Sequence, residues 1–350
     1  MVRIGSITLD APFFQAGLAG YSDAAMRLVA RRHGCPYCVT EAMLDQFLIQ
    51  GGKGVRAAEL RDEDHPIAGQ LMGSHPQDIA DGARVLIGLG YDVVDVNLAC
   101  PVRKIRRKCR GGHLLSVPDE AIAILDAVAQ SVAGEVPCTV KLRRGTDDSP
   151  EAAAAFERIF EAARRLGYAG AVVHGRTVVQ KYLGPSSWPF LRKLVDQYGC
   201  SDGFVIGGSG DVWTASDIER MRSEAGVELV SVARGCIGNP WLFAQARALA
   251  NGDPDAAARP PTIHQQRDVL REHFELSMSL HGQRRAGMLM RKFGIKFSLH
   301  HPRAEQVKRA FISVASLEDW RAVLETWFEQ DGPGRPADVE LAHTGEADGI

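Results

Sequence analysis

The sequence predicts an α/β fold: a (β/α)8 TIM barrel followed by a small all-helical domain. Eight short apolar runs alternate with helix-length amphipathic segments over residues 1–250, and only helical patterns follow a linker at 251–262. Eight parallel strands are the number that closes such a barrel, which takes about 250 residues. An open, doubly wound parallel sheet is the alternative architecture.

The predicted strands are runs rich in apolar and β-branched residues. They lie at 13–16, 37–40, 67–71, 93–96, 138–142, 170–174, 203–206 and 229–233. Helix patterns such as PQDIADGARVLIGLG and PEAAAAFERIFEAARRLG fall between them and end in glycine, the common residue just after a helix. We therefore expect residues 1–250 to form one barrel domain.

The C-terminal third has a different composition. The linker at 251–262 is rich in Gly, Pro and Asp, and residues 263–330 show only helical patterns. Between positions 267 and 309 this segment carries ten Lys or Arg against four Asp or Glu. We expect a basic helical domain here, followed by a disordered tail at 331–350, which is polar, acidic and free of aromatic residues.

Charge and cysteine content limit the classes of function. The net charge is −2, from 41 basic and 43 acidic residues, so an anionic partner must be met by local patches. No stretch approaches 18 apolar residues, and the N-terminus lacks a long apolar segment, so we expect neither a membrane span nor a signal peptide. Seven scattered cysteines are typical of reduced thiols and predict a cytoplasmic protein.

Cys35 and Cys38 form a CxxC motif, which in other proteins is a redox pair or half of a zinc site. No second CxxC completes a metal site here, and the motif lies between a helix pattern and a strand pattern rather than just after a strand. We favour two incidental, partly buried thiols, and we expect no metal.

Polar residues follow the predicted strands at their C-terminal ends, where barrel enzymes carry their active sites. Taken singly, each has a structural alternative: a lysine can cap a strand, and a histidine can be a satisfied core residue. The glycine-rich IGGSGD and the Arg-Gly of VARG follow strands seven and eight, the usual phosphate-binding position of such a barrel. The set is Gln70, Asn97, Cys100, Lys141, Arg143, His174, Arg176, Gly207, Gly208, Gly210, Arg234 and Gly235.

Concentrated positive charge follows Cys100. Six of the eight residues at 103–110 are Lys or Arg. Such a run is either a solvated face or a site that holds nucleic-acid phosphates.

These motifs resemble those of the tRNA-dihydrouridine synthase family, FMN enzymes that reduce uridines in tRNA to 5,6-dihydrouridine with NADPH. The resemblance covers about residues 10–320. Its most specific part is the N-x-x-C-P-x-R-K motif that begins at Asn97, followed by basic residues and by GGHLL at 111–115. HGRTVVQKYLGPSSW at 174–188, ARGCIGNPWLF at 233–243 and LMRK at 289–292 also match.

The resemblance implies a catalytic role for Cys100. Saturating the C5–C6 bond of uracil needs a hydride at C6, which the resemblance assigns to the reduced flavin, and a proton at C5. A cysteine of ordinary pKa, about 8.5, is mostly protonated at neutral pH and can donate that proton. The structural alternative for Cys100 is a small buried hydrophobic residue.

The resemblance also implies binding roles. Lys141 would stabilise the anionic reduced flavin at its N1–O2 edge, and Gln70 would hydrogen-bond the other edge of the pyrimidine part. The remaining cofactor-binding candidates are Gly17, Leu18, His174, Gly208, Gly210, Arg234 and Gly235. The target uracil would meet Asn97, Arg143, Arg176 and Tyr182, of which Tyr182 is as well explained by packing. The tRNA would meet Arg103, Lys104, Arg106, Arg107, Lys108, Arg291 and Lys292.

The sequence departs from the family pattern at five positions. Glycine replaces a proline at Gly17, leucine a methionine at Leu18, alanine a glycine at Ala99, serine an asparagine at Ser209 and phenylalanine a histidine at Phe293. These departures leave the subfamily and the modified tRNA position open.

The two competing functions are an FMN barrel reductase of a free pyrimidine or enone, and a flavin-free barrel that binds RNA. No obligate protein partner is expected.

Overall fold

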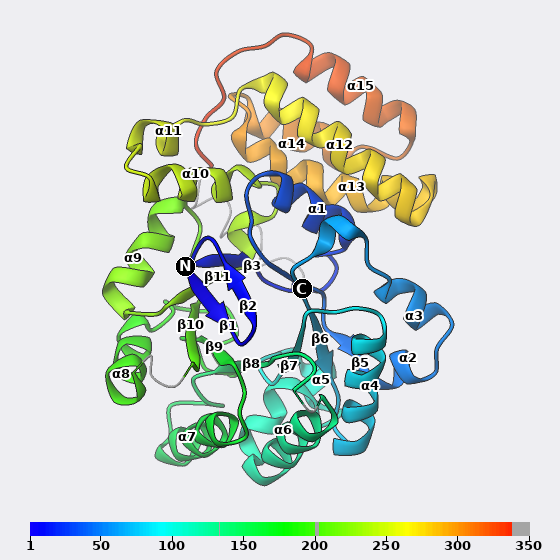
Figure 1. Ribbon diagram of the computed structural model, residues 1–350. Helices are drawn as coiled ribbons and strands as arrows, with labels where there is room; N and C mark the ends of the chain where they lie inside the picture. The colour runs from blue at the N-terminus through cyan, green and yellow to red at the C-terminus, as the bar shows by residue number, and fades with distance from the viewer. Residues whose placement is uncertain (133, 200–202, 338–350) are drawn as a thin grey trace. The chain divides into compact units, whose positions relative to one another are not determined.

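A closed ring of parallel strands is the central feature of the computed structural model, which describes residues 1–132, 134–199 and 203–337 (Figure 1). Each strand pairs in parallel with the next, and the pairings of β11 with β3 and of β4 with β6 close the ring. The predicted barrel is confirmed, and the open sheet is wrong. The eight strands are β3 (Phe13–Gln15), β4 (Cys38–Val39), β6 (Ile67–Met72), β7 (Val93–Asn97), β8 (Cys138–Arg143), β9 (Gly170–His174), β10 (Val205–Ser209) and β11 (Leu229–Val232), and β5 (Met43–Leu44) pairs with β6 beyond β4.

The barrel belongs to a first compact unit made of Met1–Asp23, Cys35–Val212 and Asp217–Ala233. Its helices form where apolar residues recur on one face, as in α7, which buries Phe156, Ile159 and Phe160. The helices are α2 (Asp45–Ile49), α3 (Lys53–Ala58), α4 (Pro76–Gly88), α5 (Arg103–Arg106), α6 (Pro118–Val132), α7 (Pro150–Arg165), α8 (Trp188–Tyr198) and α9 (Ala215–Ala225), with 3-10 turns at Asp62–Asp64 and Gly111–Ser116. The Ser149 and Ser187 side chains begin α7 and α8 by accepting backbone N–H bonds of Ala152 and Phe190.

A hairpin that the sequence analysis did not predict precedes the barrel. Strands β1 (Val2–Ile4) and β2 (Ile7–Leu9) pair antiparallel around Gly5, whose φ of 57° favours glycine. Ile4 and Leu9 are buried in one cluster with residues from the N-terminal parts of the strands, among them Phe14, Val93 and Leu229. The hairpin therefore closes the end of the barrel opposite the C-terminal ends of the strands.

A second compact unit comprises Ala24–Gly34, Trp213–Ser216 and the chain from Arg234 onward. Its core is aromatic: the Phe274 and Trp320 rings stack at a centroid distance of 4.9 Å. The helices are α1 (Ala24–Arg32), α10 (Trp241–Ala250), α11 (Pro254–Ala258), α12 (Ile263–His281), α13 (Gln283–Phe297), α14 (Ala304–Ile312) and α15 (Leu317–Phe328), with 3-10 turns at Arg234–Cys236 and Ser298–His300.

This unit holds the predicted helical segment at 263–330, and it also includes α1 and α10. The Arg32 guanidinium of α1 pairs with the Glu272 carboxylate of α12 at 2.5 Å. The predicted linker at 251–262 contains the short helix α11. Of the predicted disordered tail, residues 331–337 form no helix or strand, and residues 338–350 lie outside the described part of the chain. In the described ranges, no helix has the length and apolar character needed to cross a membrane.

Candidate active site

Five of the predicted site residues lie in the C-terminal halves of four neighbouring strands, β6 to β9. Asn97 of β7 is in register with Lys141 of β8, and His174 of β9 is in register with Arg143 of β8. Gln70 of β6 is in register with Asp95, two residues before Asn97. Because the strands are parallel and staggered around a closed barrel, these side chains meet at one mouth.

Asp95 is at the base of a directional chain of hydrogen bonds. Its buried carboxylate accepts from Gln70 Nε2 at 2.8 Å and from Thr139 Oγ1 at 2.6 Å. Gln70 must therefore direct its oxygen the other way, where Asn97 Nδ2 donates to it at 2.7 Å. Asn97 Oδ1 is then left to accept the backbone N–H groups of Ala99 at 3.0 Å and Cys100 at 3.2 Å. One carboxylate, which can only accept when ionised, thus sets the orientation of two amides and of the Cys100 loop.

The Cys100 thiol is partly buried just beyond the end of β7. Burial raises the pKa of the thiol, while a hydrogen bond with the Val102 backbone and the charge of Arg143 oppose that rise. Two glycines let the chain pass close by, since a Cβ on Gly111 would lie 2.8 Å from the Cys100 Cβ and one on Gly112 would lie 2.9 Å from the Cys100 carbonyl oxygen. The thiol is therefore protonated at neutral pH and closely surrounded.

The Lys141 amine is buried and has no hydrogen-bond partner among the described residues. Burial lowers the pKa of Lys141 to about 7, with Asp95 opposing that shift and Arg143 adding to it. A buried amine without a partner is costly, so this position is suited to a ligand that offers a negatively charged or electron-rich acceptor.

Arg143 holds two loops together. Its Nε donates to the Ala99 carbonyl at 3.0 Å, and its Nη1 donates to the Thr177 and Lys181 carbonyls, both at 2.8 Å. The side chain is buried, and its guanidinium lies 5.7 Å from the centre of the Tyr182 ring. Contact of Arg143 or Tyr182 with a uracil stays a prediction.

Arg176 is buried in an ion pair rather than exposed at the mouth. Its Nη2 donates to both carboxylate oxygens of Asp211, at 2.7 and 2.9 Å, and its Nε donates to the Gly184 carbonyl at 2.8 Å. Its Nη1 lies 3.4 Å from His174 Nε2, while Ser209 Oγ lies 3.4 Å from His174 Nδ1. These contacts indicate that Arg176 positions His174 and the loop after β9, and its predicted contact with substrate stays a prediction.

The glycines predicted to bind the cofactor differ in which neighbouring atoms can approach them because they lack a side chain. A Cβ on Gly17 would lie 2.1 Å from the Thr40 carbonyl oxygen, which explains why this chain has glycine there. A Cβ on Gly210, whose φ is 110°, would lie 2.4 Å from Ser186 Oγ and 3.0 Å from His174 Nε2, so Gly210 allows the loop after β10 to approach His174. A Cβ on Gly208 would instead meet the Met221 sulfur at 2.8 Å, so that glycine allows β10 to pack on α9.

Leu18, another predicted cofactor-binding residue, is partly buried, and its backbone N–H donates to Ser22 Oγ at 2.7 Å.

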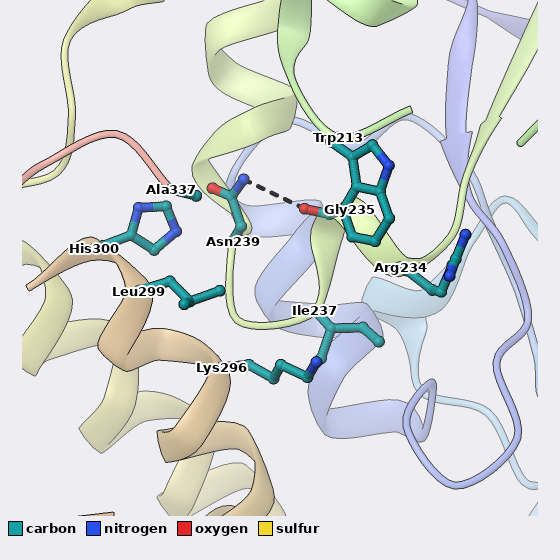
Figure 2. A pocket seen from close by; sticks show the side chains of 9 residues that line it. All are labelled: Trp213, Arg234, Gly235, Ile237, Asn239, Lys296, Leu299, His300 and Ala337. Atoms are coloured by element: carbon teal, nitrogen blue, oxygen red, sulfur yellow. Dashed lines mark hydrogen bonds between the residues drawn. The ribbon is translucent and has the colours of Figure 1, made fainter. Parts of the chain in front are cut away.

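Arg234 and Gly235, which follow β11 in the sequence, line a pocket within the second unit (Figure 2). The Arg234 guanidinium lies 4.9 Å from the centre of the Trp213 ring. Figure 2 shows Lys296 reaching the same pocket and Asn239 Nδ2 donating to the Gly235 carbonyl, at 3.3 Å. Burial lowers the pKa of His300, which also lines the pocket, to about 4, so its imidazole is neutral at pH 7.

The family model for dihydrouridine synthases matches residues 14–330. The chain belongs to this family. It is 30% identical over 285 residues to a probable tRNA-dihydrouridine synthase of Rhodobacter capsulatus, with 81% of this chain and 84% of that protein covered. It is 27% identical over 343 residues to tRNA-dihydrouridine synthase B of Xanthomonas campestris, with 97% and 100% covered.

Solved structures of other enzymes share the fold. Histamine dehydrogenase from a Rhizobium species superimposes with a TM-score of 0.55 at 14% identity, over 79% of this chain and 50% of that one. The chain thus spans half the length of that dehydrogenase, and the likeness concerns the barrel fold alone. The predictions of a TIM barrel and of an enzyme of the dihydrouridine synthase family are confirmed.

The basic run at 103–110 forms α5 and the turn after it. Arg103, Lys104, Arg107 and Lys108 are exposed, whereas Arg106 and Arg110 are partly buried. Arg110 lies 3.9 Å from the buried Asp45 carboxylate. In α13 of the second unit, Arg291 is exposed and Lys292 lies 5.7 Å from the centre of the Phe293 ring.

The CxxC pair lies at the start of β4, at the end of its strand opposite the mouth. Both thiols are buried, their sulfurs are 4.0 Å apart, and Cys35 donates to the Tyr37 carbonyl. In the described parts of the chain, His, Cys, Asp and Glu side chains do not gather in threes as a metal ion would require.

Three polar residues of the site were missed by the sequence analysis: Asp95, Thr139 and Asp211. Asp95 interrupts the apolar run VVDV, and a charged residue inside a buried strand could have been recognised as a functional signal. Thr139 and Asp211 carry no comparable signal, because their roles depend on which strands and loops become neighbours.

Proposed function

We propose that this chain reduces uridines in tRNA to 5,6-dihydrouridine, with FMN as cofactor and NADPH as reductant. The observation that carries the proposal is the hydrogen-bonded set of Gln70, Asn97 and Cys100 beside the buried amine of Lys141, in a chain of the dihydrouridine synthase family. The named relatives are tRNA-dihydrouridine synthases or probable ones, which supports tRNA as the substrate.

The residues present fit FMN. The Lys141 amine, buried and without a partner, is suited to the N1–O2 edge of the ring, where it would stabilise negative charge. Arg234 and Gly235, the residues proposed for the phosphate, line a pocket of the second unit together with Lys296. When bound, FMN supplies the hydride chemistry that none of the twenty side chains provides.

Cys100 holds the proton that the reaction needs at C5 of the uracil. Burial keeps the thiol protonated, and the Asn97 side chain fixes its backbone by accepting the Cys100 N–H. A base placed against Asn97 and Cys100 would receive the proton from the thiol as general acid. Arg143, which holds the Ala99 carbonyl, keeps this loop in place.

The tRNA is held by positive charge outside the pocket. Arg103, Lys104, Arg107 and Lys108 are exposed directly after the Cys100 loop, and Arg291 is exposed in the helical segment that we propose as the tRNA-binding domain at 263–330. A target base that must swing out of its stack leaves its phosphates to be held by such cations.

The experiment combines cofactor analysis with product detection. The purified native protein should be yellow and release FMN on denaturation. Incubated with NADPH and unmodified tRNA under anaerobic conditions, it should form dihydrouridine, detected by mass spectrometry of the nucleosides. Release of FAD or of no flavin contradicts the cofactor assignment, and reduction of free uracil without reduction of tRNA identifies a free-pyrimidine reductase instead.

A further inference from the structure

A turn after β9 exposes three apolar side chains close together in sequence. Val179, Tyr182 and Leu183 are 54%, 41% and 76% exposed. Single exposed apolar residues are common, but three within five residues next to an active site mark a binding surface.

The turn is held in one conformation by side chains beneath it. The Thr177 N–H and Arg144 Nη2 both donate to Gln180 Oε1, at 2.8 and 3.0 Å. Arg143 donates to the Lys181 carbonyl at 2.8 Å, and Lys181 has a φ of 52°, which a non-glycine residue adopts only when its surroundings require it. A turn fixed in this way loses little conformational entropy when it binds a partner.

The turn adjoins the Cys100 loop. The same Arg143 guanidinium that binds the turn donates to the Ala99 carbonyl. A Cβ on Gly112 would lie 2.9 Å from both the Cys100 carbonyl oxygen and the Val178 Cγ2, so Gly112 is in contact with both segments. The turn that carries the three apolar side chains therefore adjoins the Cys100 loop, beside the proposed uridine pocket.

The charge of this turn indicates which kind of partner it would bind. Arg176 is neutralised by its ion pair with Asp211, so the exposed charge of the segment at 174–185 is that of Lys181, and the segment contains no Asp or Glu. A partner that combines negative charge with flat apolar faces is an RNA with accessible bases, because bases stack on aromatic and aliphatic side chains while phosphates bind Lys and Arg.

We propose that this turn is a wedge for RNA bases: Tyr182 and Leu183 contact the bases that flank the target uridine and fill the space that it leaves when it swings into the pocket. Apolar side chains inserted between base steps have this effect in other nucleic-acid complexes. The proposal rests on the proposed function and adds to it the residues that separate the target from its neighbours.

The test compares Leu183→Ser and Tyr182→Ala with Ile49→Ser, an exposed apolar residue of α2 outside the proposed tRNA-binding segments. For each, the dissociation constant for unmodified tRNA is measured at several salt concentrations, together with the single-turnover rate of dihydrouridine formation. Tyr182→Ala should weaken tRNA binding by about tenfold, as loss of a stacked base does. Leu183→Ser should weaken it several-fold, Leu183→Met should restore it, and Ile49→Ser should leave it unchanged. The slope of affinity against salt should stay as in the wild type, because no phosphate contact is lost.

The outcomes separate this inference from the proposed function. If the wild type neither binds nor reduces tRNA, the proposed function and the wedge both fail. If the wild type reduces tRNA and Leu183→Ser and Tyr182→Ala bind and reduce it equally well, only the wedge fails. If Leu183→Ser leaves tRNA binding unchanged but converts a dimer to a monomer in sedimentation, the surface is an interface between copies of this chain, and the wedge is also wrong.

Discussion

Asp95 illustrates how one buried side chain orders several others. A carboxylate in contact with Thr139 and Gln70 leaves each partner one orientation, and that choice passes through Asn97 to the Cys100 backbone. Burial raises the pKa of Asp95, while its hydrogen bonds with Thr139 and Gln70 and the charge of Lys141 oppose that rise.

Asp95→Ala should lower the free energy of unfolding by about 1–3 kcal/mol, because it leaves the buried Gln70 amide and Thr139 hydroxyl without their acceptor. It should also slow reaction with tRNA by roughly tenfold or more, since the Cys100 loop loses its fixed orientation. Thr139→Val, which removes only one hydrogen bond, is the matched control and should show a smaller loss in both. Chemical denaturation and single-turnover rates measure the two effects. Equal rates for wild type and Asp95→Ala would show that the hydrogen-bond chain does not position the thiol.

Lys141 predicts a pH dependence of cofactor binding. Burial disfavours the charged form of Lys141 and lowers its pKa to about 7. The electron-rich N1–O2 edge of a bound flavin would raise that pKa, so binding takes up a proton, and affinity should fall as pH rises from 7 to 9. Titration of the flavin-free protein with FMN across this range measures the effect. Lys141→Met should bind FMN more weakly and lose the dependence. An affinity of the wild type that stays constant, or rises with pH, would remove Lys141 from the cofactor site.

At the level of single residues, the motif around Cys100 was readable from the sequence because the residues that carry it are contiguous. Asp95 lies in the strand just before this motif, but its role could not be predicted, because its partners Gln70 and Thr139 come from two other strands. Arg176 was predicted at the substrate, and its ion pair with Asp211 could not be foreseen, because 35 residues separate the two in sequence.

Among the elements, the basic run that begins with α5 has the clearest expected role. Changing Arg103, Lys104 and Arg107 to glutamine should weaken tRNA binding and flatten its salt dependence, because fewer counterions are released. Oxidation of NADPH in the absence of tRNA should stay the same. Arg165→Gln with Lys193→Gln, exposed cations of α7 and α8, is the control. An unchanged salt slope in the triple variant would mean that the run is only a solvated face.

The order of strands was predictable because each barrel strand is an apolar run followed by an amphipathic helix. The β1–β2 hairpin was missed, since two three-residue strands around Gly5 give too short a pattern, and their apolar residues are explained only by the open end of the barrel that they close. The short α11 was missed in a stretch dominated by Pro, Gly and Asp, where Asp253 begins the helix by accepting the Ala256 N–H.

At the scale of the whole molecule, the residues with proposed roles come from both compact units. The first unit holds Cys100, Lys141 and the wedge, and the second holds the cationic pocket of Arg234 and Lys296 and the exposed Arg291. Composition predicted a basic helical segment at 263–330, but it could not show that α1, far earlier in the chain, packs with α12 in the same unit.

The central claim is that Cys100 is the proton donor in a flavin-dependent reduction of tRNA uridines. Its most direct test is single-turnover reoxidation of the pre-reduced protein by excess tRNA, followed by flavin absorbance under anaerobic conditions. Cys100→Ala should retain FMN and accept electrons from NADPH, but should reoxidise about 10²–10⁴-fold more slowly than the wild type, as expected when a general acid is lost. Cys100→Ser should be nearly as slow, and Cys35→Ala and Cys38→Ala should match the wild type. If Cys100→Ala reoxidises at the wild-type rate while Cys35→Ala or Cys38→Ala is slow, the proton donor is misassigned and the CxxC pair is the catalytic one.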